Sequence, residues 1–163
     1  MGNDLQLELA DETATLALGR RLGRRCRGGE RLLLHGPLGA GKTTLVRGLG
    51  RGLGIEHGVR SPTFQLLREY RGRLVLYHAD LYRLGGTAAE FTELGLWELP
   101  GPRGVLAVEW AERGAFPGAH LTVRLSFAGA GRRIMLRDVG GAHGHLLELD
   151  TSANLTSTNP TEG

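Results

Sequence analysis

The first part of the chain alternates apolar and polar residues and then changes to a helical period. The stretch 5–9, "LQLEL", has the alternation typical of a half-buried strand. Asp11 can cap a helix after it, because apolar residues recur every four positions from Ala14 to Cys26. The opposite face of this helix carries several arginines, and we interpret it as a solvated charged face rather than a phosphate-binding one.

A short apolar strand, a glycine-rich loop and a second helix follow. Residues 32–34 are all leucine, which predicts a buried strand. The helix after the loop keeps its leucines at helical spacing, although Gly48, Gly50 and Gly52 each cost it roughly 1 kcal/mol relative to alanine. We therefore expect tertiary packing to hold this helix in place.

The later periodic segments are mostly strands. Two strands are predicted on either side of a turn at Gly72, in "FQLLREY" and "RLVLYHAD". A capping box predicts a helix over 87–99, and a buried strand is predicted over 104–110. The segments "HLTVRLSF" and "RRIMLRDV" alternate on either side of "AGAG", as the strands of a hairpin do.

This order of elements predicts an α/β fold, with a sheet flanked by helices and antiparallel strands at the C-terminal end. A chain of 163 residues has the size of one domain. We expect that domain over 1–140, and a polar tail, partly disordered, over 141–163. Ligands of such sheets bind at the carboxyl ends of the strands.

Charge and composition narrow the class of protein only slightly. The formal net charge of +3 is modest despite a pI of about 9.6, so the charge gives only weak support for nucleic-acid binding. The apolar runs are far shorter than the roughly eighteen residues that span a bilayer. A single cysteine fits a reducing compartment, and we interpret Cys26 as a small buried apolar residue. We expect a cytoplasmic protein without a membrane partner.

The loop between the short strand and the second helix is a phosphate-binding motif. "GPLGAGKT" matches G-x-x-x-x-G-K-[ST] at every fixed position. Its glycines let backbone N–H groups surround phosphate oxygens, and the helix N-terminus adds its dipole. Lys42, the one lysine among 20 basic residues, supplies a compact ammonium for the β and γ phosphates. The strand, loop and helix predict a P-loop NTPase-like sheet that binds nucleotide through Gly36, Gly39, Ala40, Gly41, Lys42, Thr43 and Thr44.

A magnesium site is predicted beside this loop. The hydroxyl of Thr43 is the usual P-loop ligand of Mg²⁺. A second ligand should be an acid at the end of an apolar strand, and Asp80 and Glu109 both qualify. One would hold the metal and the other would position the attacking water, and the residues alone leave the assignment open. His78 could form a metal-binding pair with Asp80, but a hydrogen-bonded strand histidine is favoured.

The nucleotide is predicted to be ATP rather than GTP. Guanine specificity would normally need an N-K-x-D element, and the only lysine already lies in the phosphate loop. "DVGG" at Asp138 matches the loose D-x-x-G of GTPases, but so short a motif at the end of the domain is discounted.

Five motifs together resemble the TsaE family. They are "GPLGAGKTT", "SPTF", "YHADLYRL", "ELGLWEL" and "VEWAERG", in the family's order and spacing, and the resemblance runs over 11–139. It implies an ATPase that supports the TsaB–TsaD heterodimer in the threonylcarbamoyladenosine modification of tRNA. Contact with tRNA would then be indirect, through that complex.

The resemblance also implies roles for individual residues. Thr43 and Glu109 would be the Mg²⁺ ligands, and Lys42 the phosphate lysine. Asp80 would act in catalysis by ordering the water, and Thr63, in a switch-like loop, would sense the γ-phosphate. Trp110 would lie beside the metal site, and Arg132 or its neighbour Arg133 would reach the nucleotide.

Two other functions compete with this one. A P-loop small-molecule kinase is the alternative, although the segment after Trp110 predicts strands rather than a mobile helical lid. A nucleic-acid-binding module using the arginine-rich helix is disfavoured, because no strand interleaves basic and aromatic residues as RNA-recognition strands do.

Overall fold

A computed structural model describes residues 4–62, 66–82, 93, 95–96, 98–149 and 156–157. In chain order the described helices and strands are β1 (Asp4–Leu9), α1 (Glu12–Arg25), β2 (Arg31–His35), α2 (Lys42–Gly52), β3 (Leu67–Arg71), β4 (Val75–Asp80), β5 (Gly104–Glu109), the 3₁₀ turn η1 (Ala111–Arg113), β6 (His120–Ala128), β7 (Gly131–Val139), the 3₁₀ turn η2 (Gly144–Leu146) and β8 (Thr156–Ser157). They follow the predicted order as far as β7, whereas β8 lies in the segment predicted as a polar tail.

One eight-stranded mixed sheet organises these elements, in the order β3-β4-β5-β2-β6-β7-β1-β8. Its centre is parallel, since β2 pairs parallel with β5 and β6, and β4 pairs parallel with β5. The other pairings are antiparallel, including the predicted β6–β7 hairpin. The α/β fold with antiparallel strands at the C-terminal end is confirmed. In the parallel block, the carboxyl ends of β2, β4 and β5 meet at one edge of the sheet.

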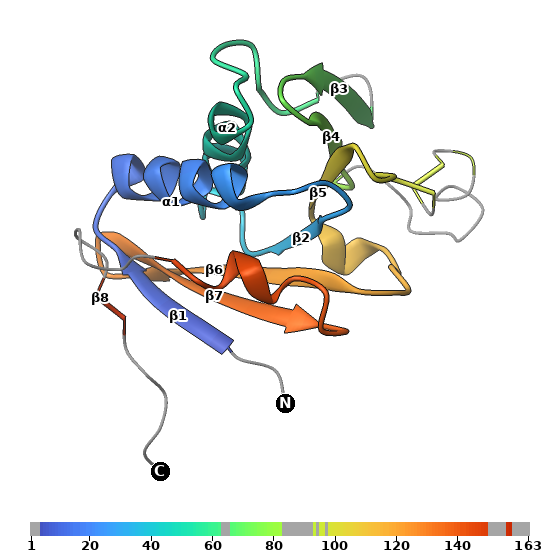
Figure 1. Ribbon diagram of the computed structural model, residues 1–163. Coiled ribbons are helices and arrows are strands. Elements are labelled where there is room, and N and C mark those ends of the chain that lie inside the picture. The colour runs from blue at the N-terminus through green and yellow to red at the C-terminus, as the bar shows by residue number, and fades with distance from the viewer. Residues whose placement is uncertain are drawn as a thin grey trace.

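Helices α1 and α2 lie side by side on one face of the sheet (Figure 1). Glycines line their contact. A Cβ atom on Gly48 would lie 2.2 Å from the carbonyl oxygen of Leu16, and one on Gly52 would lie 2.3 Å from that of Arg20. The glycines that weaken α2 as an isolated helix therefore permit the close packing that holds it. Asp11 caps α1 as predicted, its side chain accepting a hydrogen bond of 2.9 Å from the N–H of Ala14.

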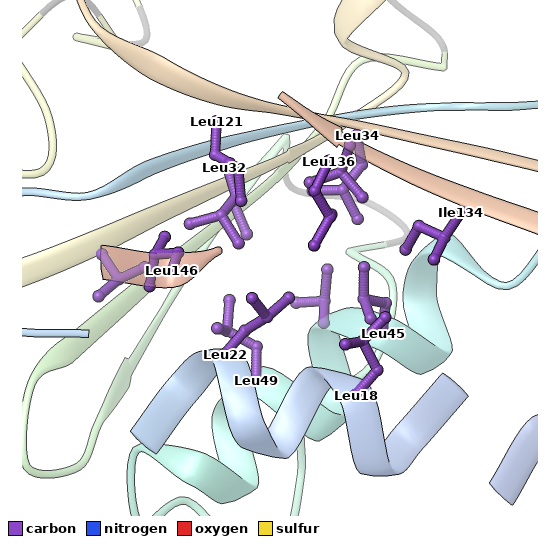
Figure 2. Close-up of a cluster of buried hydrophobic side chains, with 14 of the residues drawn as sticks. Leu18, Leu22, Leu32, Leu34, Leu45, Leu49, Leu121, Ile134, Leu136 and Leu146 are labelled. Carbon is purple, nitrogen blue, oxygen red and sulfur yellow. The ribbon is translucent and has the colours of Figure 1, made fainter. Parts of the chain in front are cut away.

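The main core lies between these helices and the sheet. Figure 2 shows leucines of α1 and α2 pointing toward apolar side chains of the strands, with Leu146 of η2 in the same cluster. Cys26 is buried there, and burial raises the pKa of its thiol, so its interpretation as a small apolar residue is confirmed. The labelled members of the cluster are Leu18, Leu22, Leu32, Leu34, Leu45, Leu49, Leu121, Ile134, Leu136 and Leu146.

A second, smaller cluster covers the opposite face of the sheet. Successive residues of β2 alternate between the faces, so Leu33 belongs to this cluster whereas Leu32 and Leu34 belong to the main one. Leu96 and Ala111 also contribute. The predicted helix over 87–99 lies largely outside the described residues.

The chain after β7 packs against the domain as far as the structure describes it. Leu146 and His143 are buried, and β8 pairs with β1. The boundary between a domain over 1–140 and a tail over 141–163 stays a prediction, since most residues from 150 onward are not described. Among the described helices, none has the length and apolar character needed to cross a membrane.

Candidate functional site

The phosphate loop connects the end of β2 to the start of α2 through backbone that only glycine adopts readily. Gly41, the residue before α2, is left-handed at φ 105° and ψ 17°. Gly36 has φ 150°, and a Cβ atom there would lie 2.6 Å from the carbonyl oxygen of Leu125. No side chain caps the N-terminus of α2. The first N–H groups of the helix are therefore available for an anion, as in other helix-terminal phosphate sites.

Lys42 is the first residue of α2, and its side chain folds back over the loop. Its ammonium donates hydrogen bonds to the carbonyl oxygens of Gly36 and, at 3.1 Å, of Pro37. The same nitrogen lies 3.8 Å from the ring centroid of Trp110, a cation–π contact. Burial lowers the pKa of Lys42, and the neighbouring carboxylates oppose this shift. The only lysine thus lies at the centre of the predicted site.

The two candidate acids end neighbouring parallel strands. Asp80 of β4 and Glu109 of β5 are register partners. Glu109 is 3% exposed, and its Oε1 accepts a hydrogen bond of 2.7 Å from the hydroxyl of Thr43. Asp80 is only half-buried, and its carboxylate accepts hydrogen bonds from the Ser61 hydroxyl (2.9 Å) and the Tyr82 N–H (3.0 Å). Glu109 therefore lies against the P-loop hydroxyl, while Asp80 faces the loop that follows α2.

The second oxygen of Glu109 also has a partner. His78 of β4 is fully buried, and its Nε2 lies 2.5 Å from Oε2 of Glu109. A carboxylate only accepts hydrogen bonds, so Nε2 is the donor. Of the two interpretations of His78, the structure supports the hydrogen-bonded strand histidine.

The donor set beside the loop fits magnesium. Within the described residues, no three His, Cys, Asp or Glu side chains cluster closely enough to hold a metal on their own. Thr43 and Glu109 instead present two hard oxygen atoms 2.7 Å apart at the edge of a cavity. Magnesium in nucleotide sites is typically held this way, by one or two protein oxygens, phosphates and water.

A cavity of about 550 Å³ joins these groups. That volume is in the range of small-molecule sites. Besides the phosphate loop, the cavity is lined by both acids, Tyr82 and Trp110. Its lining comprises Leu38, Gly39, Ala40, Gly41, Lys42, Thr43, Thr44, Ser61, Pro62, Leu66, Asp80, Tyr82, Glu109 and Trp110.

Trp110 directly follows Glu109 and lines the same cavity as Thr43. It is the one non-glycine residue with positive φ in the described part of the chain, at 57°. Its ring lies against Tyr82, with 4.9 Å between centroids. The sequence alone did not indicate Tyr82 or the pairing of Ser61 with Asp80, because each contact joins segments that are separated in the chain.

A second cavity, of about 300 Å³, borders the other side of the same loop. It is lined by Arg132 and by the first residues of α1, among them Glu12 and Thr15. Arg132 donates a 3.2 Å hydrogen bond to the carbonyl oxygen of Gly39. Arg133 instead pairs with Glu8 at 2.7 Å. Of the two arginines, Arg132 is therefore the one placed at the phosphate loop.

Comparison with known proteins shows the family of the chain. A family model described as "Threonylcarbamoyl adenosine biosynthesis protein TsaE" matches residues 9–135. The chain belongs to the TsaE family. The tRNA threonylcarbamoyladenosine biosynthesis protein TsaE of Nostoc sp. is 46% identical over 134 residues, which cover 77% of this chain and 80% of the relative. That of Bacillus subtilis is 39% identical over 138 residues, covering 82% and 85%.

A solved structure has the same fold as this chain. The crystal structure of Bacillus subtilis YdiB superposes with a TM-score of 0.72 at 32% identity, covering 91% of this chain and 94% of that one. The TsaE match includes the phosphate loop, both acids and Arg132, and it ends before the segment that packs after β7. Thr63, the remaining predicted site residue, lies outside the described residues.

Proposed function

We propose that this TsaE family member binds and hydrolyses Mg-ATP in the cytoplasm to support a TsaB–TsaD complex in the threonylcarbamoyladenosine modification of tRNA. One observation carries the proposal: the phosphate loop, its lysine and two strand-end acids line a single cavity. The family's role in tRNA threonylcarbamoyladenosine biosynthesis supplies the biological setting. Contact with tRNA is proposed to occur only through the partner complex.

The phosphate loop holds the triphosphate in this proposal. Backbone N–H groups at Gly39 to Thr44 surround phosphate oxygens, and Lys42 exchanges its carbonyl partners for the β and γ phosphates. Thr43 and Glu109 would hold Mg²⁺, which when bound neutralises charge on those phosphates. The nucleoside extends into the second cavity, where Arg132 flanks the loop.

Asp80 is proposed to orient the attacking water. Its carboxylate lines the cavity from β4, the strand next to the one that carries Glu109, and in this proposal it would face the outer end of the triphosphate. The water oxygen bonds to the γ-phosphorus while the bond from that phosphorus to the bridging oxygen breaks, and ADP leaves with the electron pair. Thr63 is proposed to sense the γ-phosphate.

Phosphate release from Mg-ATP tests the proposal. It is measured with the pure protein alone and with TsaB and TsaD added. Slow release that accelerates with the pair is expected for a partner-dependent ATPase. If the rate of ATP turnover is unchanged by TsaB and TsaD but increases with a small hydroxylated metabolite, the alternative, a P-loop small-molecule kinase, would be supported instead.

A further inference from the structure

We propose that His78 is a positioning residue that holds the carboxylate of Glu109 in the orientation in which one oxygen faces the metal. The inference rests on the proposed magnesium site and concerns a residue outside the donor set. His78 lies on β4 and Glu109 on the neighbouring β5, two register positions apart. The ring is fully buried, so it reaches neither the nucleotide cavity nor solvent.

The two oxygens of Glu109 have separate partners. Oε1 accepts from the Thr43 hydroxyl at 2.7 Å, and Oε2 accepts from Nε2 of His78 at 2.5 Å. Because His78 occupies Oε2, the carboxylate presents Oε1 on the side of the phosphate loop. Without that bond, the carboxylate could rotate about its terminal torsion, which is a broad one. His78 therefore fixes the orientation of the carboxylate.

His78 has no other hydrogen bond among the described residues. Its Nδ1 is buried and lacks a partner. An unpartnered buried nitrogen costs free energy, so a polar ring at this position is a poor choice for packing alone. Among the described residues, its one polar contact is with Glu109. Groups that hydrogen-bond to metal-ligating carboxylates are needed for metal affinity, and their loss typically costs 10–100-fold.

Metal binding in the presence of ADP tests this role independently of turnover. The probe is Mn²⁺, whose free concentration is followed by electron paramagnetic resonance in titrations of the full chain. His78→Leu keeps an apolar side chain of similar size but removes the donor. We expect its Mn²⁺ affinity to fall about 10–100-fold, with ADP affinity in the absence of metal unchanged.

Conservative variants separate positioning from packing. In His78→Gln, the amide nitrogen lies about as far from the backbone as Nε2, so we expect affinity within a few-fold of wild type. His78→Asn has a shorter amide and should behave like the leucine variant. If His78 only filled space, Mn²⁺ affinity would not be retained in His78→Gln and lost in His78→Asn. This comparison tests the inference even if His78→Leu fails to fold.

His143→Leu is the matched control. His143 is equally buried and also carries an unpartnered Nδ1, but its Nε2 accepts from the N–H of Arg31, at the amino end of β2. This control should bind Mn²⁺ as wild type does. Wild-type affinity in His78→Leu or His78→Asn would overturn the inference. Absence of Mn²⁺ and ADP binding in the wild type would instead contradict the proposed function itself.

Discussion

At the residue scale, Asp80 and Glu109 occupy equivalent positions on neighbouring strands and meet different partners. Glu109 is buried and lies between the Thr43 hydroxyl and His78. Asp80 is half-buried and bonded to Ser61, in a loop beside the cavity. A buried, doubly held carboxylate suits a fixed metal ligand, whereas a carboxylate beside a loop can meet a water molecule.

Substitution of each acid by its amide should separate these roles. Asp80→Asn should lower the rate of ATP hydrolysis about 10²–10⁴-fold, the usual contribution of a positioned acid or base, with Mn²⁺ affinity in the presence of ADP little changed. Glu109→Gln should weaken Mn²⁺ binding. Single-turnover phosphate release and Mn²⁺ titration measure the two effects. The reverse pattern would mean that the assignments must be exchanged.

Much of the site could be predicted from local sequence. The phosphate loop is a contiguous motif, so Gly36 through Thr44 needed no tertiary information. Assigning the two acids from residues alone was impossible, because it depends on the β4–β5 register and on which acid meets Thr43. The partner of His78 and the place of Tyr82 were missed for the same reason, since each contact joins segments far apart in the chain.

At the element scale, the contact between α1 and α2 explains why a helix rich in glycine is stable. The low helix propensity of glycine disfavours α2, and the sequence indicated only that tertiary packing must compensate for this cost. The structure gives the reason: Gly48 and Gly52 allow the backbones of the two helices to approach closely.

Gly48→Ala should therefore destabilise the protein. The new Cβ atom would meet backbone, the carbonyl oxygen of Leu16, at 2.2 Å. Overpacking costs about 1–3 kcal/mol, and a backbone clash should lie at the upper end, above the gain of about 1 kcal/mol in helix propensity. Denaturant unfolding measures the difference.

Gly50→Ala is the control in the same helix. Its Cβ atom would meet a side-chain methyl of Val59 at 2.9 Å, and that side chain can move. We expect a change within about 1 kcal/mol. Equal stability of the Gly48→Ala and Gly50→Ala proteins would contradict the proposed role of the helix contact.

At the scale of the whole molecule, the segment after β7 is held at the end of the sheet opposite the phosphate loop. Glu30 accepts hydrogen bonds from the N–H groups of Arg27 and Gly28 and from the His145 ring, at 2.7–2.8 Å. Burial pushes the pKa of Glu30 upward, but these bonds outweigh it and lower the pKa overall. The polar composition of this segment gave no sign of such packing, because its partners lie more than a hundred positions earlier.

This arrangement should make the free energy of unfolding decrease as the pH falls. Burial lowers the pKa of His143 below its usual 6.5, despite the carboxylates of Asp138 and Glu30 nearby. Below pH 6.5 the unfolded chain therefore gains a proton that the folded chain does not, and stability falls as pH falls toward the folded pKa, by at most about 1.4 kcal/mol per pH unit. The shift of Glu30 has the same sign but acts below pH 4.5.

His143→Gln should remove that contribution. Its amide oxygen can still accept from the N–H of Arg31, but it does not titrate. Urea unfolding between pH 7 and pH 5 should show a shallower loss of stability in the variant than in wild type. Some loss should remain in both proteins, because burial also lowers the pKa of His35. Identical slopes in the two proteins would exclude His143 as a source of the acid sensitivity.

The most direct test of the account is the equilibrium affinity for ATP with Mg²⁺, measured by calorimetry for wild type and Lys42→Ala. A hydrogen bond to a charged group contributes about 1.5–3 kcal/mol, so we predict about a 10–150-fold loss. Arg133→Ala, which removes a positive charge paired with Glu8 outside both cavities, should stay within about twofold. Unchanged ATP affinity in Lys42→Ala would contradict the assignment of the phosphate loop as the nucleotide site.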